Sequence, residues 1–540
     1  MFAPGLVALP LVFGLLQPSD ALPGRGDEFL TVAESSEYTR TAAHAQVVDL
    51  MDRLASASPL AVRAQLGRTS EDREIPLLII ADPPVSSAVE ARASGKVIFF
   101  AFANIHAGEV EGKEALLMLA RELATSEGHP LLKDLVVVLA PIYNADGNDR
   151  FGPVARNRPG QDGPEEVGVR PNAQGFDLNR DYVKLESPEA RALVRFFTEW
   201  DPHVTVDCHT TNGSYHRYTL TYDAPTNPSG FLPSIEFVRD AMLPEVTKRL
   251  LARTGYDTFF YGDFNRDHTA WVTYSAQPRY GGPYQGLRGQ MQVLSEAYSY
   301  APYRDRVICT REFVRELMTY SAEHREKVLE LHQQARETTI VRGSDPQPSD
   351  VVGIRHRFAA APGLVIAKGW EYENPPPPPQ GEGRRGVRLR PTTTPKDYPV
   401  VHLGRFEPTL SVSRPLAYLI PPGHDDIVEK LRQHGVTVES FAGDAVVEAY
   451  EVTSIASAQQ PFQGRTIRSL DVRASREKAT LPQGSTIVRT AQPLGNLIVY
   501  LLEPQSEDGL AAWDFFGDRL MVGSRYPVMR VRTTDDLPAQ

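Results

Sequence analysis

Residues 96–109 read KVIFFAFANIHAGE. The apolar first half has the length and composition of a β-strand that is buried on both faces of a sheet. The run ends in a turn that carries His106 and, three positions later, Glu109. An imidazole and a carboxylate at this spacing can reach one metal ion from one short segment, and zinc takes ligands of this kind. The segment therefore predicts a strand whose end binds a metal.

A third metal ligand is expected at His209, directly after the apolar run 203–208. His203 begins the same run, so it should lie at the opposite end of the strand. His216 lies beyond the following turn. A catalytic zinc keeps three protein ligands and one open position for water. We therefore expect one Zn²⁺ per chain, with His106, Glu109 and His209 as its ligands.

Strands and helices alternate around these residues. Strand-like apolar runs lie at 76–80, 134–140 and 290–295, and helical apolar spacing lies at 111–123 and 188–200. This alternation is typical of an α/β domain. We expect a mixed, mostly parallel central sheet that is covered by helices on both faces. Ligands bind such sheets at the carboxyl ends of strands, and His106, His209 and Glu296 each follow a predicted strand.

The chain divides into four segments. We expect a signal peptide at 1–21, the α/β domain at 22–345, a Pro-rich linker or extended loop at 346–395, and a smaller accessory domain at 396–540. The third segment contains the run Pro375–Pro379, which favours an extended, exposed conformation. The last segment has helical and strand-like patterns without a catalytic constellation, so we expect an α+β or β-rich domain there.

The first segment predicts secretion. Residues 5–16 form an apolar run about as long as the hydrophobic region of a signal peptide. Ser19 and Ala21 have the small side chains of a cleavage site, although no Lys or Arg precedes the run. No later segment reaches membrane-spanning length without charges. We therefore expect a secreted or periplasmic protein without a membrane span.

Charge and cysteine content narrow the class of protein further. The net charge is −11 at pH 7, and no basic stripe stands out, so the sequence argues against nucleic-acid binding. The two cysteines, Cys208 and Cys309, are too few for a disulfide framework. We expect both to be buried free thiols. The sequence does not indicate an oligomeric state.

Three further motifs follow the His106–Glu109 pair in a fixed order. They are Asn-Ala-Asp-Gly at 144–147, Asp-Leu-Asn-Arg at 177–180 and Leu-Ser-Glu-Ala at 294–297. With the strand-terminal His209, this set resembles the zinc carboxypeptidases of the carboxypeptidase A type, over about residues 35–335. The stretch Arg-Pro-Asn-Ala-Gln-Gly at 170–175 is similar to the bacterial, murein-peptide-amidase-like branches rather than to the digestive enzymes.

The resemblance implies a role for each matching residue. His106, Glu109 and His209 would bind zinc, and Glu296 would act as general base and acid on the zinc-bound water. Asn179 and Arg180 would bind the free C-terminal carboxylate of a peptide.

Other roles keep several candidates. Arg170 would stabilise the oxyanion, with Arg158 and Arg156 as rivals. The pocket tyrosine of the family matches Tyr274, Tyr280 or Tyr284. Arg288, which lies just before Glu296, is a weaker hypothesis for the recognition of acidic groups in the pocket.

The leading interpretation is a zinc metallocarboxypeptidase that hydrolyses the C-terminal peptide bond of peptides. A second interpretation keeps the zinc site but changes the substrate to a cell-wall (murein) peptide or an N-acyl amino acid. A third is a non-catalytic binding module on a degenerate peptidase fold. The presence of all three ligands, the general base and the Asn-Arg pair counts against this last interpretation.

Overall fold

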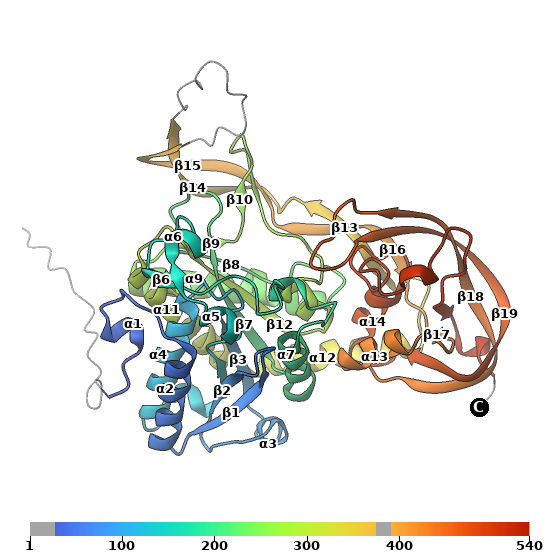
Figure 1. Ribbon diagram of the computed structural model, residues 1–540, viewed down its shortest axis with the longest axis horizontal. Helices are drawn as coiled ribbons and strands as arrows, with labels where there is room; N and C mark the ends of the chain where they lie inside the picture. Colours follow the sequence, from blue (N-terminus) through green and yellow to red (C-terminus); the bar gives the residue numbers. More distant parts are fainter. Residues whose placement is uncertain (1–27, 374–389, 539–540) are drawn as a thin grey trace, which may run out of the picture.

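The computed structural model describes residues 28–373 and 390–538. Both the expected signal peptide and the run Pro375–Pro379 lie outside these described residues. Figure 1 shows two large parts, one at each end of the molecule, with an extended sheet above and between them. No helix within the described residues is long and apolar enough to cross a membrane. Cys208 and Cys309 are buried and unbridged, as expected.

An eight-stranded sheet forms the centre of the first part, in the order β1-β2-β4-β3-β7-β12-β8-β9. The strands β4, β3, β7 and β12 are parallel to one another, while β1, β2 and β8 join by antiparallel pairing. The expected mixed sheet is therefore confirmed. The strands are β1 (Ala61–Arg68), β2 (Glu74–Ile80), β3 (Val97–Ala103), β4 (Leu135–Ala140), β7 (Val204–Thr211), β8 (Leu220–Asp223), β9 (Thr258–Phe260) and β12 (Met291–Tyr298).

Both faces of this sheet are covered, because successive side chains of a strand point to opposite faces. In β3, Val97, Phe99 and Ala101 pack with one group of helices. Those helices are α2 (His44–Ala57), α4 (Glu111–Thr125), α9 (Leu243–Thr254) and α11 (Tyr303–Glu323). Phe100 and Phe102 point the other way, toward α7 (Pro188–Trp200) and the second part of the chain.

The segment at 346–395, expected as a linker or loop, contains regular structure where it is described. It forms β13 (Val351–Ala359) and β14 (Leu364–Glu373). The strand β14 pairs with β15 (Arg390–Leu403), and β15 pairs with β11 (Ala270–Val272) of the first part. The buried residues in the middle of β14 are Ala367 and Gly369, whereas Leu364 and Ile366 are exposed, so burial in this strand does not follow the hydrophobicity of its side chains. The chain therefore returns to the first part instead of leaving it.

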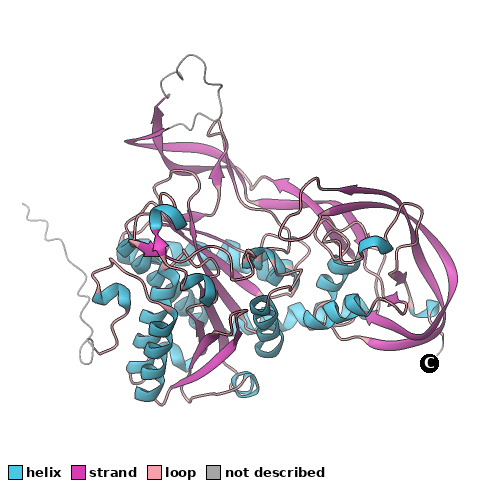
Figure 2. Cartoon of the chain, viewed as in Figure 1, coloured by secondary structure: helices cyan, strands magenta, loops and turns pink. Residues whose placement is uncertain are grey.

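The second part is β-rich, as expected. Four strands form a closed barrel in the order β17-β19-β18-β20. They are β17 (Ala417–Ile420), β18 (Glu439–Ser457), β19 (Arg468–Arg489) and β20 (Met529–Val531). The helices α13 (Asp425–Gln433) and α14 (Gly495–Leu502) lie between the barrel and the first part. Figure 2 shows how far the long strands β18 and β19 extend this part away from the central sheet.

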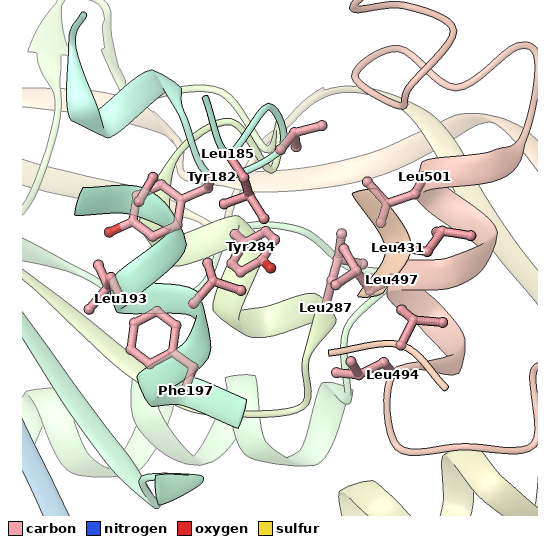
Figure 3. Close-up of a cluster of buried hydrophobic side chains, with 14 of the residues drawn as sticks. Tyr182, Leu185, Leu193, Phe197, Tyr284, Leu287, Leu431, Leu494, Leu497 and Leu501 are labelled. Carbon is pink, nitrogen blue, oxygen red and sulfur yellow. The ribbon is translucent and has the colours of Figure 1, made fainter. Parts of the chain in front are cut away.

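The two parts share one hydrophobic core. Side chains from α7 and from α10 (Gly281–Leu287) meet those of α13 and α14 in a single buried cluster, which Figure 3 shows. Tyr284 and Leu287 come from the first part, and Leu431, Leu497 and Leu501 come from the second. All five are at most 1% exposed. Separating the parts would expose this cluster to water, so we expect them to fold as one unit.

Substitution of Leu497 by Ala tests this unity. The side chain is fully buried, so its truncation should cost about 2–5 kcal/mol of unfolding free energy. Denaturant titrations followed by circular dichroism and by loss of activity should shift together in one transition. Val522, which is 65% exposed, provides the control, because its replacement by Ala should change stability little. A separate early transition that leaves activity intact would contradict the shared core.

Candidate functional site

Three possible metal ligands meet at the carboxyl ends of β3 and β7. His106 and Glu109 lie in the turn after β3, and His209 lies within β7, beside β3 in the parallel sheet. Their ligand atoms all lie within 4.8 Å of one another. Glu109 Oε1 is 2.9 Å from Nδ1 of His106, and Glu109 Oε2 is 3.1 Å from Nδ1 of His209. Both imidazoles therefore present the same nitrogen to one carboxylate.

Asn104 shapes the turn that carries the first two ligands. Its φ of 66° lies in the left-handed region, which Asn tolerates better than most residues. Its side-chain amide donates hydrogen bonds to the carbonyl oxygens of Ala107 and Glu109, at 3.1 and 3.2 Å. These bonds satisfy buried backbone groups and hold the turn between β3 and α4. The apolar strand thus ends in a fixed loop rather than a mobile one.

The other ring nitrogen of each histidine lies close to a second carboxylate. Asp177 Oδ1 is 3.0 Å from Nε2 of His106, and Asp207 Oδ1 is 3.1 Å from Nε2 of His209. Such partners fix the tautomer and orientation of metal-binding imidazoles. Two imidazoles, one carboxylate and their buried carboxylate partners form a donor set that suits zinc. The sequence analysis did not assign these two aspartates, although the two-residue period of a strand places Asp207 on the same face as His209.

The charges of the ligand cluster depend on one another. Burial alone would raise the pKa of Glu109, but His106 and Arg158 hold it well below its usual range. Burial would lower the pKa of His209, but Asp207 and Glu109 raise it well above its usual range. Without a metal, a proton is therefore stabilised on this cluster. A divalent cation meets the same negative charges, so metal and proton compete for the site.

Glu296 lies beside the ligands on the next strand. It pairs in register with His209 across β12 and β7, and it is half-buried at the same end of the sheet. Burial raises the pKa of Glu296 to about 8; His209 opposes this shift and Glu109 adds to it. A bound cation would lower this pKa by Coulomb attraction. Glu296 does not belong to the ligand group, so its carboxylate is left to exchange protons.

A cavity of about 260 Å³ connects these residues. All seven residues to which the sequence assigned roles line it: His106, Glu109, Arg170, Asn179, Arg180, His209 and Glu296. Tyr274 and Tyr280 also line it, and so does Tyr261, which the sequence analysis did not consider. Tyr284 is fully buried in the shared core, where its hydroxyl is 2.7 Å from Nδ1 of His434. Of the three tyrosines that the sequence offered for the pocket, Tyr274 and Tyr280 line the cavity and Tyr284 does not.

The three arginines considered for the oxyanion role differ in their surroundings. Arg158 is buried and donates to Glu109 Oε1 at 3.0 Å and to the carbonyl oxygen of Thr210 at 2.9 Å. Arg170 donates to Asp177 Oδ2 at 2.8 Å, but 41% of its side chain is exposed in the cavity. Arg156 is exposed and does not line the cavity. Arg158 and Arg170 both line the cavity, and the Arg170 side chain is the more exposed of the two, at 41% against 9%.

Arg180 lies at the cavity wall against an aromatic ring. Its guanidinium carbon is 4.3 Å from the ring centre of Tyr280, within the range of a cation–π interaction. Its nearest approach to Asp177 is 3.9 Å. The neighbouring Asp181 pairs instead with Lys184 at 3.0 Å. Asp177 is therefore the nearer carboxylate to Arg180, and the contact is longer than the 2.8 Å between Asp177 and Arg170.

The hypothesis that Arg288 faces the pocket is wrong. Arg288 is 4% exposed and donates to the carbonyl oxygen of His434 at 2.9 Å and to Thr198 Oγ1 at 3.0 Å. It does not line the cavity. The helix α10 separates Arg288 from the cavity wall. Arg288 is therefore near Glu296 in the sequence but does not share the cavity with it. Arg288 connects the two parts of the molecule.

Known proteins resemble this chain in sequence. Residues 47–276 match the family model described as zinc carboxypeptidase. Carboxypeptidase 2 of Trichophyton rubrum is 24% identical over 500 residues, covering 89% of this chain and 85% of the relative. Carboxypeptidase D of Rattus norvegicus is 31% identical over 176 residues, covering 27% of this chain and 12% of the relative. The fungal match is long enough to include much of the second part as well as the first.

Solved structures also resemble about half of this chain. A metallo-carboxypeptidase from Burkholderia cenocepacia has a TM-score of 0.38 and 17% identity, covering 51% of this chain and 68% of that chain. Carboxypeptidase A from Helicoverpa armigera has a TM-score of 0.39 and 15% identity, covering 52% and 74%.

Replacement of Asp207 by Asn tests the role of the carboxylates behind the histidines. The variant should keep the fold but bind zinc about 10–100-fold more weakly, because Asp207 orients His209. Competition with a chromophoric chelator measures this affinity. Asp267→Asn, in an exposed loop, is the matched control and should bind zinc as the wild type does. Equal zinc affinity in the two variants would show that His209 needs no such partner.

Proposed function

We propose that the residues lining the cavity of the first part, which matches the zinc carboxypeptidase family over residues 47–276, release single residues from the C-terminus of peptides. The observation that carries this proposal is the position of Asp177. Its carboxylate lies 3.0 Å from the zinc ligand His106 and 2.8 Å from Arg170, with Arg180 at 3.9 Å. The buried Asp177 carboxylate thus lies close to the metal site and to both arginines, all of which line or adjoin the same cavity.

The cations suit a substrate that ends in a carboxylate. Arg180 can bind two carboxylate oxygens with a planar guanidinium, which a lysine could not reproduce. Asn179 stands beside it, and its side-chain oxygen accepts a hydrogen bond from the backbone of Gly281 at 3.2 Å. The amide group of Asn179 is thereby oriented with its donor end available for the same carboxylate. A chain end held here places its last peptide bond toward the metal ligands.

The chain's own groups then carry the proton transfers. When bound, zinc lowers the pKa of a coordinated water and polarises a carbonyl. Glu296 accepts the proton of the attacking water and gives it to the leaving amine nitrogen as the C–N bond breaks. Arg170 donates hydrogen bonds to the carbonyl oxygen as negative charge develops there. Glu296 must therefore begin the reaction ionised, and Arg170 must remain protonated throughout.

Glu296→Gln tests this assignment. The variant should keep about one zinc per chain and lose turnover by about 10²–10⁴-fold, the usual size of a general acid–base contribution. The assay combines metal analysis with release of C-terminal residues from unblocked peptides and from the same peptides with amidated ends. The amidated peptides are the control and should not be hydrolysed. Full activity of the variant, or equal cleavage of blocked peptides, would contradict the proposal.

A second substrate class follows from residues 170–175, whose sequence is similar to that of murein-peptide amidases. Cell-wall peptides and N-acyl amino acids also end in a carboxylate, so Arg180 and Asn179 would serve them in the same way. The peptide panel should therefore include a muropeptide and an N-acyl amino acid. If the protein hydrolyses only these two compounds, its substrates belong to this second class.

We also propose that the protein acts outside the cytoplasm, in the periplasm or the medium. The support is the apolar run 5–16 followed by the small residues Ser19 and Ala21. Expression of the full chain in its natural host, followed by mass measurement of the mature protein, should give an N-terminus at Leu22. An intact Met1 on a cytoplasmic protein would overturn the proposal.

A further inference from the structure

We infer that the second part of the chain positions the site for the substrate carboxylate. It does so through two contacts to the loops of the site, made on the side of each loop that faces away from the cavity. This inference rests on the proposed function, because it concerns the residues assigned to the C-terminal carboxylate. Two loops are involved. We call residues 175–180 the arginine loop, since it carries Arg180, and residues 277–282 the tyrosine loop, since it carries Tyr280.

The two loops form one wall of the cavity and depend on each other. The backbone N–H of Gly281 donates to Asn179 Oδ1 at 3.2 Å, and Tyr280 lies against the Arg180 guanidinium at 4.3 Å. The arginine loop has only the short 3₁₀ turn Leu178–Arg180, and Tyr280 precedes the first residue of α10. Strand or helix hydrogen bonds therefore do little to fix the side chains that would hold the substrate.

The first contact comes from the connection between β18 and β19. Gln463 Oε1 accepts the backbone N–H of Asp177 at 2.8 Å. Gln463 and Gly464 have φ values of 50° and 81°, and Phe462 and Arg465 pair on either side of them. This is the pattern of a tight two-residue hairpin turn with both central residues in the left-handed region. The acceptor is thus presented by a rigid tip rather than by a mobile loop.

Asp177 is the residue whose position this contact fixes. Its carboxylate holds His106 and Arg170, and Arg180 follows three residues later. Asp177 is 9% exposed, so loss of the Gln463 acceptor would leave its N–H without this partner in a largely buried place. A buried donor without an acceptor is destabilising. Movement of the loop toward water would relieve that cost and displace the groups attached to it.

The second contact comes from Asp508, which follows α14. Asp508 Oδ2 accepts the backbone N–H of Arg279 at 2.7 Å, and Oδ1 lies 2.9 and 2.7 Å from two nitrogens of the Arg279 guanidinium. The Asp508 side chain is fully buried. The guanidinium carbon is also 4.7 Å from the ring centre of Trp513 and 5.4 Å from that of Phe462. Arg279 directly precedes Tyr280, so both ends of this residue are fixed by the second part.

Gln463 and Asp508 are positioning residues, because neither lines the cavity. They also differ from the shared core, whose apolar side chains join the two parts through α7, α10, α13 and α14. The core accounts for the stability of the assembly without them. The two polar contacts instead end on the backbone N–H groups of Asp177 and Arg279. Asp177 is the carboxylate partner of His106, and Arg279 directly precedes Tyr280, which lies against Arg180. Their loss should therefore change substrate binding more than it changes folding.

Full-length, zinc-loaded variants of both residues test the inference. Gln463→Met keeps the length of the side chain but removes the acceptor. Asp508→Asn keeps the shape and one acceptor oxygen, and Asp508→Leu removes both. The matched control is Tyr284→Phe, which removes one hydrogen bond between the two parts, to His434 at 2.7 Å, without touching either loop.

We expect KM for an unblocked peptide to rise about tenfold in Gln463→Met, as the loss of one buried hydrogen bond predicts. For Asp508, KM should rise in the order wild type, Asn, Leu. Zinc content should stay near one per chain in all variants. Tyr284→Phe should lower the melting temperature but leave KM unchanged. An unchanged KM in the Gln463 and Asp508 variants, or an equal rise in Tyr284→Phe, would overturn the inference.

Calorimetry separates this inference from the proposed function. Binding of an unblocked peptide to zinc-loaded Glu296→Gln reports on the carboxylate site without turnover, and the amidated peptide is its control. Adding Gln463→Met or Asp508→Leu to this background should weaken only the binding of the unblocked peptide. If wild type neither cleaves nor prefers unblocked peptides, the proposed function fails. If it does both and the added substitutions change nothing, only the positioning role fails.

Discussion

The whole site depends on the buried carboxylate of Asp177. Burial opposes its ionisation, yet His106, Arg180 and Arg170 hold the pKa of Asp177 far below its ordinary value. A buried charge of this kind is tolerated only with close partners, so Asp177 and its partners constrain one another. The metal ligand, the oxyanion candidate and the substrate cation cannot move independently. The remainder of the fold provides the walls that keep this group in place.

The residues around Asp177 follow from simple sheet geometry, and for that reason the sequence revealed most of them. The ends of parallel strands meet at one edge of a sheet, which brings His106, His209 and Glu296 together from distant segments. A period of two also places Asp207 behind His209. The order of the motifs supplied Asn179 and Arg180 through a family resemblance, and the cavity contains both. Local pattern and strand direction were enough for His106, His209 and Glu296, whereas Asn179 and Arg180 needed the resemblance, and Asp207 was not assigned.

The errors and omissions have a different physical origin. Arg288 and Tyr284 were associated with the pocket because they precede Glu296, but α10 turns both toward the second part of the chain. The strand β14 was missed because its buried positions are the small residues Ala367 and Gly369, whereas its large apolar residues Leu364 and Ile366 are exposed. The contact between Gln463 and Asp177 joins positions 286 residues apart. No periodic pattern encodes such a pair, since it arises only when segments far apart in the sequence meet in the folded chain.

Recognition of a terminal carboxylate requires a guanidinium whose position is fixed before the substrate arrives, because ordering it afterwards would cost binding energy. A helix or strand normally provides that rigidity. Here Arg180 and Tyr280 lie at the ends of short or irregular elements, and the cavity that they line must stay open to admit a peptide. Bracing from the cavity side would block the substrate. Support from the side away from the cavity avoids this conflict, and the hairpin tip and Asp508 of the second part provide it. The second part is therefore better understood as the rear wall of the active site than as an appended domain.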